Sequence, residues 1–249
     1  MLAHRSSASI LAVASDPKQN LLLAALPDLD RQRWLPHLEF VELPLGHVLY
    51  EAGDTLSHAY FPANAIISLL YVMQSGESAE IAVVGREGVV GISLLMGGDS
   101  TSSRAVVQNA GYGFRIPAQV VKEEFKNAAP VLHLLLRYTQ ALITQMTQTA
   151  ACNKHHSLNQ QLCRWLLLSL DRLPSDELVM TQQLIANMLG VSLAAMNEGA
   201  LFLQHAGLIR YTDGRIIVLN RAGLEKLTCE CYAVVKNEYD RLLPATTAH

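Results

Sequence analysis

The sequence predicts an α+β fold built from a β-roll (jelly-roll-like) domain, a long helix and a C-terminal winged helix-turn-helix. Three observations support this fold class. Short β-rich runs separated by Gly, Pro and Asn fill the region from Phe40 to about residue 116. A heptad pattern follows Pro130, and near Gly190 two helical segments flank a glycine turn that precedes a hairpin.

Composition limits the class of protein. The chain has 249 residues, half of them hydrophobic, which is enough for two domains with full cores. Its net charge of −3 does not show the basic excess that is typical of many nucleic-acid-binding proteins. The four cysteines are too few for a disulfide framework, which favours a reducing compartment, and we expect a cytoplasmic protein.

The N-terminal part carries no targeting or membrane signal that we recognise. The apolar run Ile10–Ala14 has five residues, which is shorter than the core of a secretory signal. No window reaches the ~18 apolar residues of a membrane span, so we expect no membrane partner. We interpret residues 1–19 as a flexible tail.

The domain predicted for residues 20–128 begins with a helical segment and continues as short strands. The run AIISLLYVM, the turn QSGES and the run AEIAVV form a predicted hairpin. A glycine-rich stretch, residues 85–104, follows, and two more strands close the region. Many short strands at regular intervals are typical of a barrel or roll.

A long helix is predicted for residues 129–156. Positions at alternating spacings of three and four form a heptad seam that is apolar at first and polar later. The pattern alone fits either a helix packed on its own domain or the interface of a parallel dimer. The predicted seam consists of Leu132, Leu135, Thr139, Leu142 and Met146.

Residues 157–249 contain the most specific local signal. Thr181 is suited to cap the helix QQLIANML, and Gly190 can adopt the positive φ of the turn that follows. Ser192 is suited to cap a second helix, LAAMNEGALFLQH. The segments IRY and IIVL, joined at an Asp-Gly turn, predict a two-stranded wing.

Several segments resemble the Crp/Fnr family of bacterial regulators over residues 20–243. They are LPLGHVLYEAGD, AYFP, VGREGVVG, MTQQLIANMLGVS, LQHAGLIRY and RAGLEKLTCECY, and the last two are similar to an uncharacterised branch of the family. The resemblance implies a cyclic-nucleotide-binding-like sensor, a homodimer along the long helix and a winged helix that binds double-stranded promoter DNA. RNA polymerase is a further possible partner.

The sensor departs from the family's cyclic-nucleotide receptors. Those receptors have Glu after the cassette glycine and an Arg-Ser pair for the cyclic phosphate, whereas this chain has Ile92 after Gly91 and Ser102-Ser103 at the Arg-Ser positions. Isoleucine cannot accept a hydrogen bond from a ribose hydroxyl, so we expect no cyclic AMP binding. The expected effector pocket, or packed core in the alternative interpretation, contains Gly88, Gly91, Ser102, Ser103 and Arg104.

Cofactor sites are not expected. No cysteine precedes Cys152, which excludes the family's iron–sulfur chemistry, and histidines in the sensor half leave haem as a minor alternative. We expect Cys229 and Cys231 on one helix, where side chains two residues apart diverge by about 200° and do not readily chelate one ion. Cys152, His155 and His156 lack a fourth ligand, so we predict no metal site.

The second helix of the helix-turn-helix also departs from the family. Its exposed N-terminal positions hold Leu193, Ala194 and Glu198 rather than arginines that read guanine. From Ser175 onward there are six basic and eight acidic side chains, which predicts weak attraction to phosphate. The remaining candidate DNA contacts are Gln182, Gln183, Ser192, Asn197, Arg210 and Arg215.

Two functions remain open at this point. One is a transcription regulator that responds to an effector other than cyclic AMP. The other is a sensory or protein-interaction module that kept the fold and lost specific DNA readout. We expect no enzyme, because no nucleophile elbow, phosphate loop or HExxH motif is present.

Overall fold

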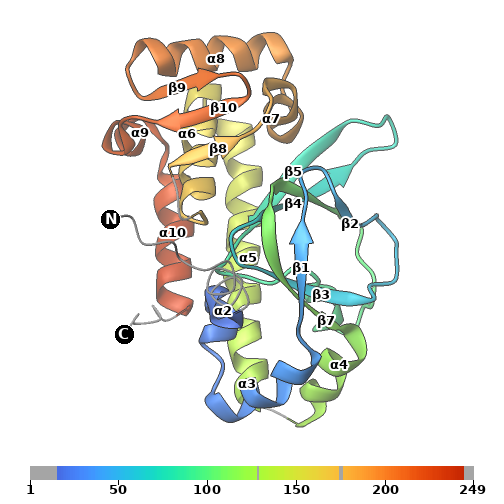
Figure 1. Ribbon diagram of the computed structural model, residues 1–249. Helices are drawn as coiled ribbons and strands as arrows, with labels where there is room; N and C mark the ends of the chain where they lie inside the picture. The colour runs from blue at the N-terminus through green and yellow to red at the C-terminus, as the bar shows by residue number, and fades with distance from the viewer. Residues whose placement is uncertain (1–15, 128, 174–175, 244–249) are drawn as a thin grey trace, which may run out of the picture.

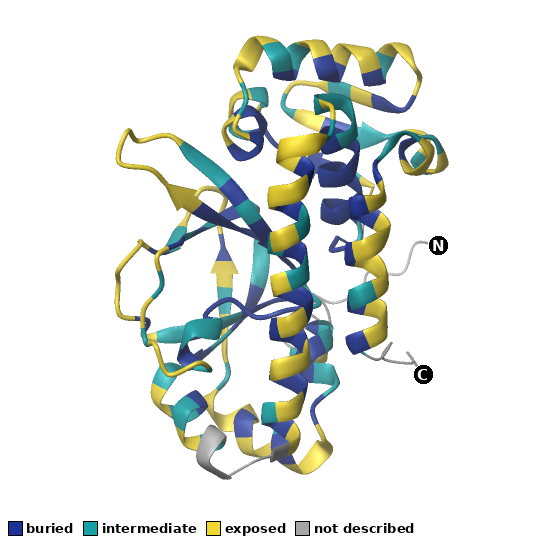
Figure 2. Ribbon diagram, turned by 180° about the vertical axis from the view of Figure 1, so that it is seen from behind, coloured by how far each residue is buried: buried dark blue, intermediate teal, exposed yellow. Residues whose placement is uncertain are grey.

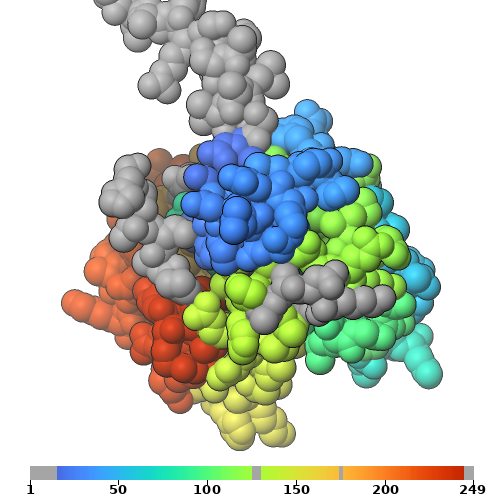
Figure 3. Space-filling view, turned by 90° about the horizontal axis from the view of Figure 1, so that it is seen from below, coloured from blue at the N-terminus to red at the C-terminus, as the bar shows by residue number. Residues whose placement is uncertain are grey.

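The computed structural model describes residues 16–127, 129–173 and 176–243. Figure 1 shows a β-roll packed on one side of a long helix, with the C-terminal helices and a small sheet at the far end of that helix. Seen from below, the N-terminal helices in blue and the C-terminal helix in red both lie beside the long helix (Figure 3). The arrangement agrees with the predicted α+β class.

The described chain begins with short helical segments. They are η1 (Pro17–Gln19), α2 (Leu21–Ala24), α3 (Asp28–Trp34) and η2 (Leu35–His37). Asn20 caps α2 and is fully buried, and its amide donates hydrogen bonds to the carbonyls of Pro62 and Gly88. Residues 16–19, predicted to be part of a flexible tail, therefore have a defined conformation, and residues 1–15 lie outside the described part.

The β-roll contains two antiparallel sheets. Its strands are β1 (Glu39–Leu43), β2 (Val48–Tyr50), β3 (His58–Pro62), β4 (Ile66–Val72), β5 (Ser78–Val84), β6 (Arg104–Asn109) and β7 (Gly111–Pro117), with η3 (Ile92–Leu94) before β6. The strand orders are β1-β7-β3 and β2-β6-β4-β5. The pairing of β4 with β5, from Ile67 with Val84 to Val72 with Ser78, confirms the predicted hairpin.

Three helices connect the roll to the C-terminal part: α4 (Ala118–Asn127), α5 (Ala129–His155) and α6 (Leu158–Leu170). Ser157 begins α6 with a capping box, in which its hydroxyl accepts from the Gln160 amide while Gln160 accepts from the Ser157 amide. α5 and α6 thus meet at His156 and Ser157.

The C-terminal part comprises β8 (Glu177–Val179), α7 (Gln182–Leu189), α8 (Leu193–His205), β9 (Ile209–Thr212), β10 (Arg215–Val218), α9 (Arg221–Leu227) and α10 (Glu230–Leu242). The strands form a sheet in the order β8-β10-β9, so β8 adds a third strand that the sequence did not predict. α10 packs along α5 and returns toward the roll.

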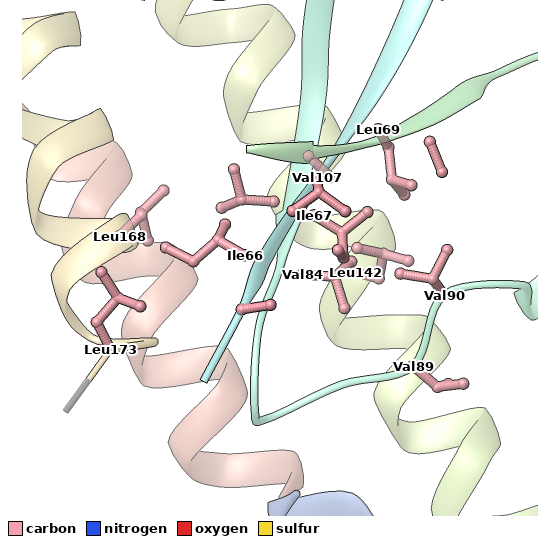
Figure 4. Close-up of a cluster of buried hydrophobic side chains, with 14 of the residues drawn as sticks. Ile66, Ile67, Leu69, Val84, Val89, Val90, Val107, Leu142, Leu168 and Leu173 are labelled. Carbon is pink, nitrogen blue, oxygen red and sulfur yellow. The ribbon is translucent and has the colours of Figure 1, made fainter. Parts of the chain in front are cut away.

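One buried apolar cluster joins these parts. Ile67, Val84 and Val107 from the roll, Leu142 from α5 and Leu168 from α6 lie together in it (Figure 4). The inner space of the roll beside α5 is filled by such side chains, including Val89 and Val90 from the loop after β5.

Candidate functional site

The helix-turn-helix is formed by local capping chemistry. The Thr181 hydroxyl accepts from the Leu184 amide at the start of α7, and Gly190 ends α7 with φ +66°. The Ser192 hydroxyl accepts from the Ala195 amide and begins α8. The axes of α7 and α8 are bent by 108°. Both ends of the turn therefore follow the predicted residues.

The wing is a hairpin next to α8. Asp213 and Gly214 have φ of +52° and +73° at its tip, as an Asp-Gly hairpin turn requires. Arg210 on β9 is exposed. Arg215 on β10 is also exposed, but its Nη1 lies 2.5 Å from Glu177 Oε1 on β8. The positive charge of Arg215 is therefore neutralised by Glu177 within the wing sheet.

The outward face of α8 carries both apolar and ionisable side chains. Ala194, Glu198, Leu201 and His205 follow one another at spacings of three and four and are all exposed. Leu201 is 51% exposed and the neighbouring Phe202 45%. Sequence reasoning missed Leu201, Phe202 and His205, although the helical period measured from the buried Met196 and Leu203 would have placed them outward.

The predicted DNA contacts lie at different depths. Gln183 is exposed but donates to the Asn187 side chain, and Gln182 is half-buried. Ser192 is exposed and uses its hydroxyl as the cap of α8. Asn197 is half-buried, and among the described residues its Oδ1 has no hydrogen-bond partner. Asn197 thus lies on the flank of α8 rather than on the outward stripe.

The five predicted effector-pocket residues lie in different surroundings. Gly88 packs against the ring of Tyr138 so closely that an added Cβ would lie 2.5 Å from the ring. Ser103 is buried, whereas Ser102 is exposed. The guanidinium of Arg104 lies 3.3 Å from Glu51 Oε1 at the edge of the roll. Gly91 adopts φ +107° before η3.

Two cavities lie near the sensor, and none of these five residues lines either of them. The first, about 230 Å³, is lined by residues of β2, β3 and their connection, including Tyr50 and His58. Burial raises the pKa of Tyr50 to about 12, so its phenol remains neutral. The second cavity, about 310 Å³, lies between α2, α6 and α10. Of the four sensor-half histidines that left haem as a minor alternative, His37, His47, His58 and His133, only His58 lines one of these two cavities.

The predicted dimer seam lies on the side of α5 that packs against its own chain. Leu135, Thr139 and Leu142 are buried in the core of their own chain, and Leu132 and Met146 are half-buried. The heptad pattern therefore belongs to the inner face of α5, the face that packs against the rest of the same chain. The opposite face is exposed along the helix, as seen from behind in Figure 2. This outer stripe consists of Leu136, Gln140, Ile143, Thr147, Ala150 and Lys154.

Four side chains with metal-binding atoms converge where α5 ends. They are Cys152, His156, Cys229 and Cys231, and their ligand atoms all lie within 4.8 Å of one another. The prediction that Cys229 and Cys231 lie within one helix is wrong, because Cys229 is the extended N-cap residue of α10. Burial raises the pKa of Cys152 to about 12 and of Cys231 to about 11.

In the described part of the chain, no single helix is long and apolar enough to cross a membrane. The sharply bent pair of α7 and α8 reaches that length and hydropathy only when the two helices are taken together.

Comparison with known proteins identifies both halves of the chain. Residues 40–128 match the model of the cyclic nucleotide-binding domain, and residues 160–227 match the Crp-like helix-turn-helix domain. A search of curated proteins returned no match.

Solved structures share the fold at low sequence identity. FixK2 from Bradyrhizobium japonicum is 14% identical with a TM-score of 0.65, over 77% of this chain and 98% of that one. A CRP-family transcriptional regulator from Thermus thermophilus is 16% identical with a TM-score of 0.63, over 75% and 95%. The c-di-GMP-responsive global regulator CLP from Xanthomonas campestris is 16% identical with a TM-score of 0.60, over 75% and 96%. With both domain models matched in this order around a long helix, the chain belongs to the Crp/Fnr family of transcriptional regulators.

Proposed function

We propose that this protein is a homodimeric regulator that binds double-stranded promoter DNA through α8 and the wing, under the control of an effector other than cyclic AMP. The observation that carries the proposal is the capped helix-turn-helix with its wing, which presents one complete face of α8 to the outside. A cytoplasmic location and contact with RNA polymerase belong to the same proposal.

The chemistry of that face predicts its mode of DNA recognition. Ala194, Leu201 and Phe202 are suited to apolar contact with thymine methyl groups, and Glu198 can accept from the amino group of cytosine. Arg210 is the exposed wing arginine for which a phosphate contact is most favourable, because Arg215 is paired with Glu177. Each phosphate contact adds about 0.9 to the slope with which the logarithm of the DNA-binding constant falls against the logarithm of the salt concentration. Because few such contacts are expected, the affinity for DNA should depend only weakly on salt.

Selection from a random DNA library at low salt tests this function. We expect a two-fold symmetric motif with half-sites about 34–36 Å apart. Leu201→Asp should abolish enrichment because it adds a negative charge to the face that meets the bases. Leu29→Asp is the matched control, since Leu29 is 74% exposed on α3 at the opposite end of the molecule. Enrichment that survives Leu201→Asp would contradict the assignment of α8.

The alternative function is a protein-interaction module. It is favoured by the outward face of α8, which exposes Leu201 and Phe202 beside Glu198. The helix has no arginine or lysine between Leu193 and His205. If the wild type enriches no motif in the same selection, this alternative replaces the first.

The absence of cyclic AMP binding is the second half of the proposal. It is supported by the pairing of Arg104 with Glu51 at the roll edge and by the packing of the loop at Gly88 against Tyr138. The relative from Xanthomonas campestris responds to c-di-GMP, so this fold can take another effector. Calorimetric titration with cyclic AMP should give no stoichiometric binding, and a micromolar site would refute this part.

A further inference from the structure

The strongest unexplained feature lies at the junction of α5, α6 and α10. Cys152 lies in the last turn of α5, and His156 follows one turn later on the same face, with its amide bonded to the Cys152 carbonyl at 3.0 Å. Cys229 and Cys231 come from the start of α10. Two segments 73 or more residues apart in the sequence thus contribute two ligand atoms each.

The distances agree with a tetrahedron around one small cation. With Zn–S near 2.3 Å and Zn–N near 2.0–2.1 Å, tetrahedral geometry places two sulfurs about 3.8 Å apart and a sulfur and a nitrogen about 3.5 Å apart. The Sγ atoms of Cys152 and Cys229 lie 3.5 Å apart, and Cys231 Sγ lies 3.6 Å from His156 Nδ1. The remaining pairs stay within 4.8 Å.

The extended backbone of Cys229 makes this convergence possible. Its φ of −85° and ψ of 167° turn the chain before α10 begins at Glu230. A pair separated by two positions inside a helix would diverge, but a cap residue and the second helical residue need not. All three cysteines are buried, at most 4% exposed, and form a cluster separate from the main core.

The neighbouring side chains are suited to orient His156 and to offset the negative charge of the site. The second ring nitrogen of His156, Nε2, lies 3.3 Å from Glu230 Oε2, the carboxylate–histidine arrangement that orients metal-binding imidazoles. Three thiolates and one Zn²⁺ carry a net charge of −1. The buried guanidinium of Arg164 is close enough to act on the Cys152 and Cys231 thiols, and among the described residues its Nε has no hydrogen-bond partner.

We propose that Cys152, His156, Cys229 and Cys231 bind one Zn²⁺ ion as a closed Cys₃His structural site. Binding converts the three thiols to thiolates and releases three protons to the solvent, with no change of oxidation state. Four protein ligands leave no position for substrate, as in structural rather than catalytic zinc sites. The ion would link the start of α10 to the end of α5, next to the start of α6.

A disulfide between Cys152 and Cys229 is the competing chemistry for the same atoms. It would leave Cys231 and the oriented imidazole of His156 without a role. It would also need an oxidant, whereas zinc uses all four side chains as they stand. The two alternatives differ in mass, metal content and thiol count.

The test uses the untagged full-length protein, purified from zinc-supplemented cells without chelator. Elemental analysis should give about one zinc per chain, and denaturation with a chelator should release it with four titratable thiols. Metal-free protein reconstituted with Co²⁺ should show tetrahedral d–d bands and thiolate-to-cobalt charge transfer. The proposal would be overturned by a zinc content below about one tenth of an ion per chain together with no cobalt spectrum. It would also be overturned by a disulfide, seen as a protein mass lower by two hydrogens and as two titratable thiols in place of four.

Matched variants identify the ligands. Cys231→Ser should lower the cobalt charge-transfer intensity by about one third, because one thiolate of three is lost, and His156→Ala should weaken zinc binding by at least the 10–100-fold seen even for outer-shell changes. The controls are Cys163→Ser, the fourth buried cysteine but outside the cluster, and His155→Ala, the exposed neighbour of His156. Both controls should retain one zinc and an unchanged spectrum. Loss of the metal in either control, or its full retention in both ligand variants, would contradict the assignment.

Discussion

At the scale of single residues, Glu80 is the most unusual group of the sensor. It lies on β5, is 8% exposed, and accepts a hydrogen bond from the Ser68 hydroxyl. Burial raises its pKa from 4.5 to about 7, although Arg164, Trp165 and Arg172 act in the opposite direction. Between about pH 4.5 and 7 the folded protein therefore holds a proton on Glu80 that the unfolded chain would release.

Glu80→Gln should remove a pH dependence of stability. Because the folded pKa is the higher one, the wild type is stabilised by the protonated carboxyl below pH 4.5 and loses that contribution as the pH rises through about 7. The loss is on the order of 3 kcal/mol, from about 1.36 kcal/mol per pKa unit. Urea titrations between pH 5 and 8 should show the variant gaining stability relative to wild type as pH rises, and parallel profiles would contradict the shift.

Gly88→Ala tests whether the loop after β5 is core or open pocket. The added Cβ would lie 2.5 Å from the ring and hydroxyl of Tyr138, whose Oη donates to the Val89 carbonyl at 3.0 Å. Such overpacking should cost about 1–3 kcal/mol of unfolding free energy, measured by thermal or urea denaturation. Gly98→Ala in the same region meets nothing closer than 3.6 Å and should be neutral. Equal stability of the two variants would indicate an open site at Gly88.

At the scale of elements, α5 shows what a heptad pattern can and cannot predict. The spacing of Leu135 and Leu142 correctly predicted a helix with one apolar face. It did not say what covers that face, because an intramolecular core and a partner helix require the same side chains. The roll and α10 cover it, and the outer stripe with Leu136 and Ile143, about half exposed, remains for a second chain.

Two double variants separate these faces. Leu136→Asp with Ile143→Asp should give a folded monomer by light scattering, because the charges fall on the outer stripe. Leu135→Asp with Leu142→Asp should unfold the protein, because each buries a charge in the core at a cost of several kcal/mol. A dimer that persists in the outer-stripe variant would place the interface elsewhere.

The helix-turn-helix was predictable to the residue because its determinants are local. Thr181, Gly190 and Ser192 act on amides or dihedral angles within four positions of themselves. The cysteine cluster was not predictable, since it depends on α10 folding back along α5 and on one extended residue at Cys229. The contact between Gly88 and the ring of Tyr138 was likewise not predictable, because Tyr138 lies on α5, 50 positions away in the sequence.

At the scale of the whole molecule, the two halves share buried polar contacts. Arg172, just after α6, has its Nε 2.7 Å from Glu87 Oε1 in the loop after β5. Its Nη2 donates to Gln145 on α5, and Gln145 donates to the Val83 carbonyl on β5. The guanidinium also lies over the ring of Tyr239 on α10, 5.3 Å from its centre. One arginine thus contacts the sensor, the long helix and the C-terminal helix.

These contacts predict that the sensor and the DNA-binding half unfold as one unit. The chain has two tryptophans, both buried, Trp34 in the sensor and Trp165 in α6. Trp165→Phe leaves a fluorescent probe of the sensor, and Trp34→Phe leaves a probe of the other half. In these single-tryptophan backgrounds, urea unfolding curves should coincide, as a cooperative transition requires.

Arg172→Met should separate the two curves. It leaves the Glu87 carboxylate and the Gln145 amide oxygen without their cationic partner, and removal of one member of a buried pair costs about 3–5 kcal/mol, less here because Glu87 is 16% exposed. Adding Glu87→Gln should recover part of the loss, with a coupling energy above about 0.5 kcal/mol between contacting residues. The exposed pair Lys236–Asp240 on α10 is the control, and its double-mutant cycle should show a coupling energy below about 0.5 kcal/mol. Coincident curves in Arg172→Met, or additive effects at Arg172 and Glu87, would mean that the apolar cluster alone holds the two halves together.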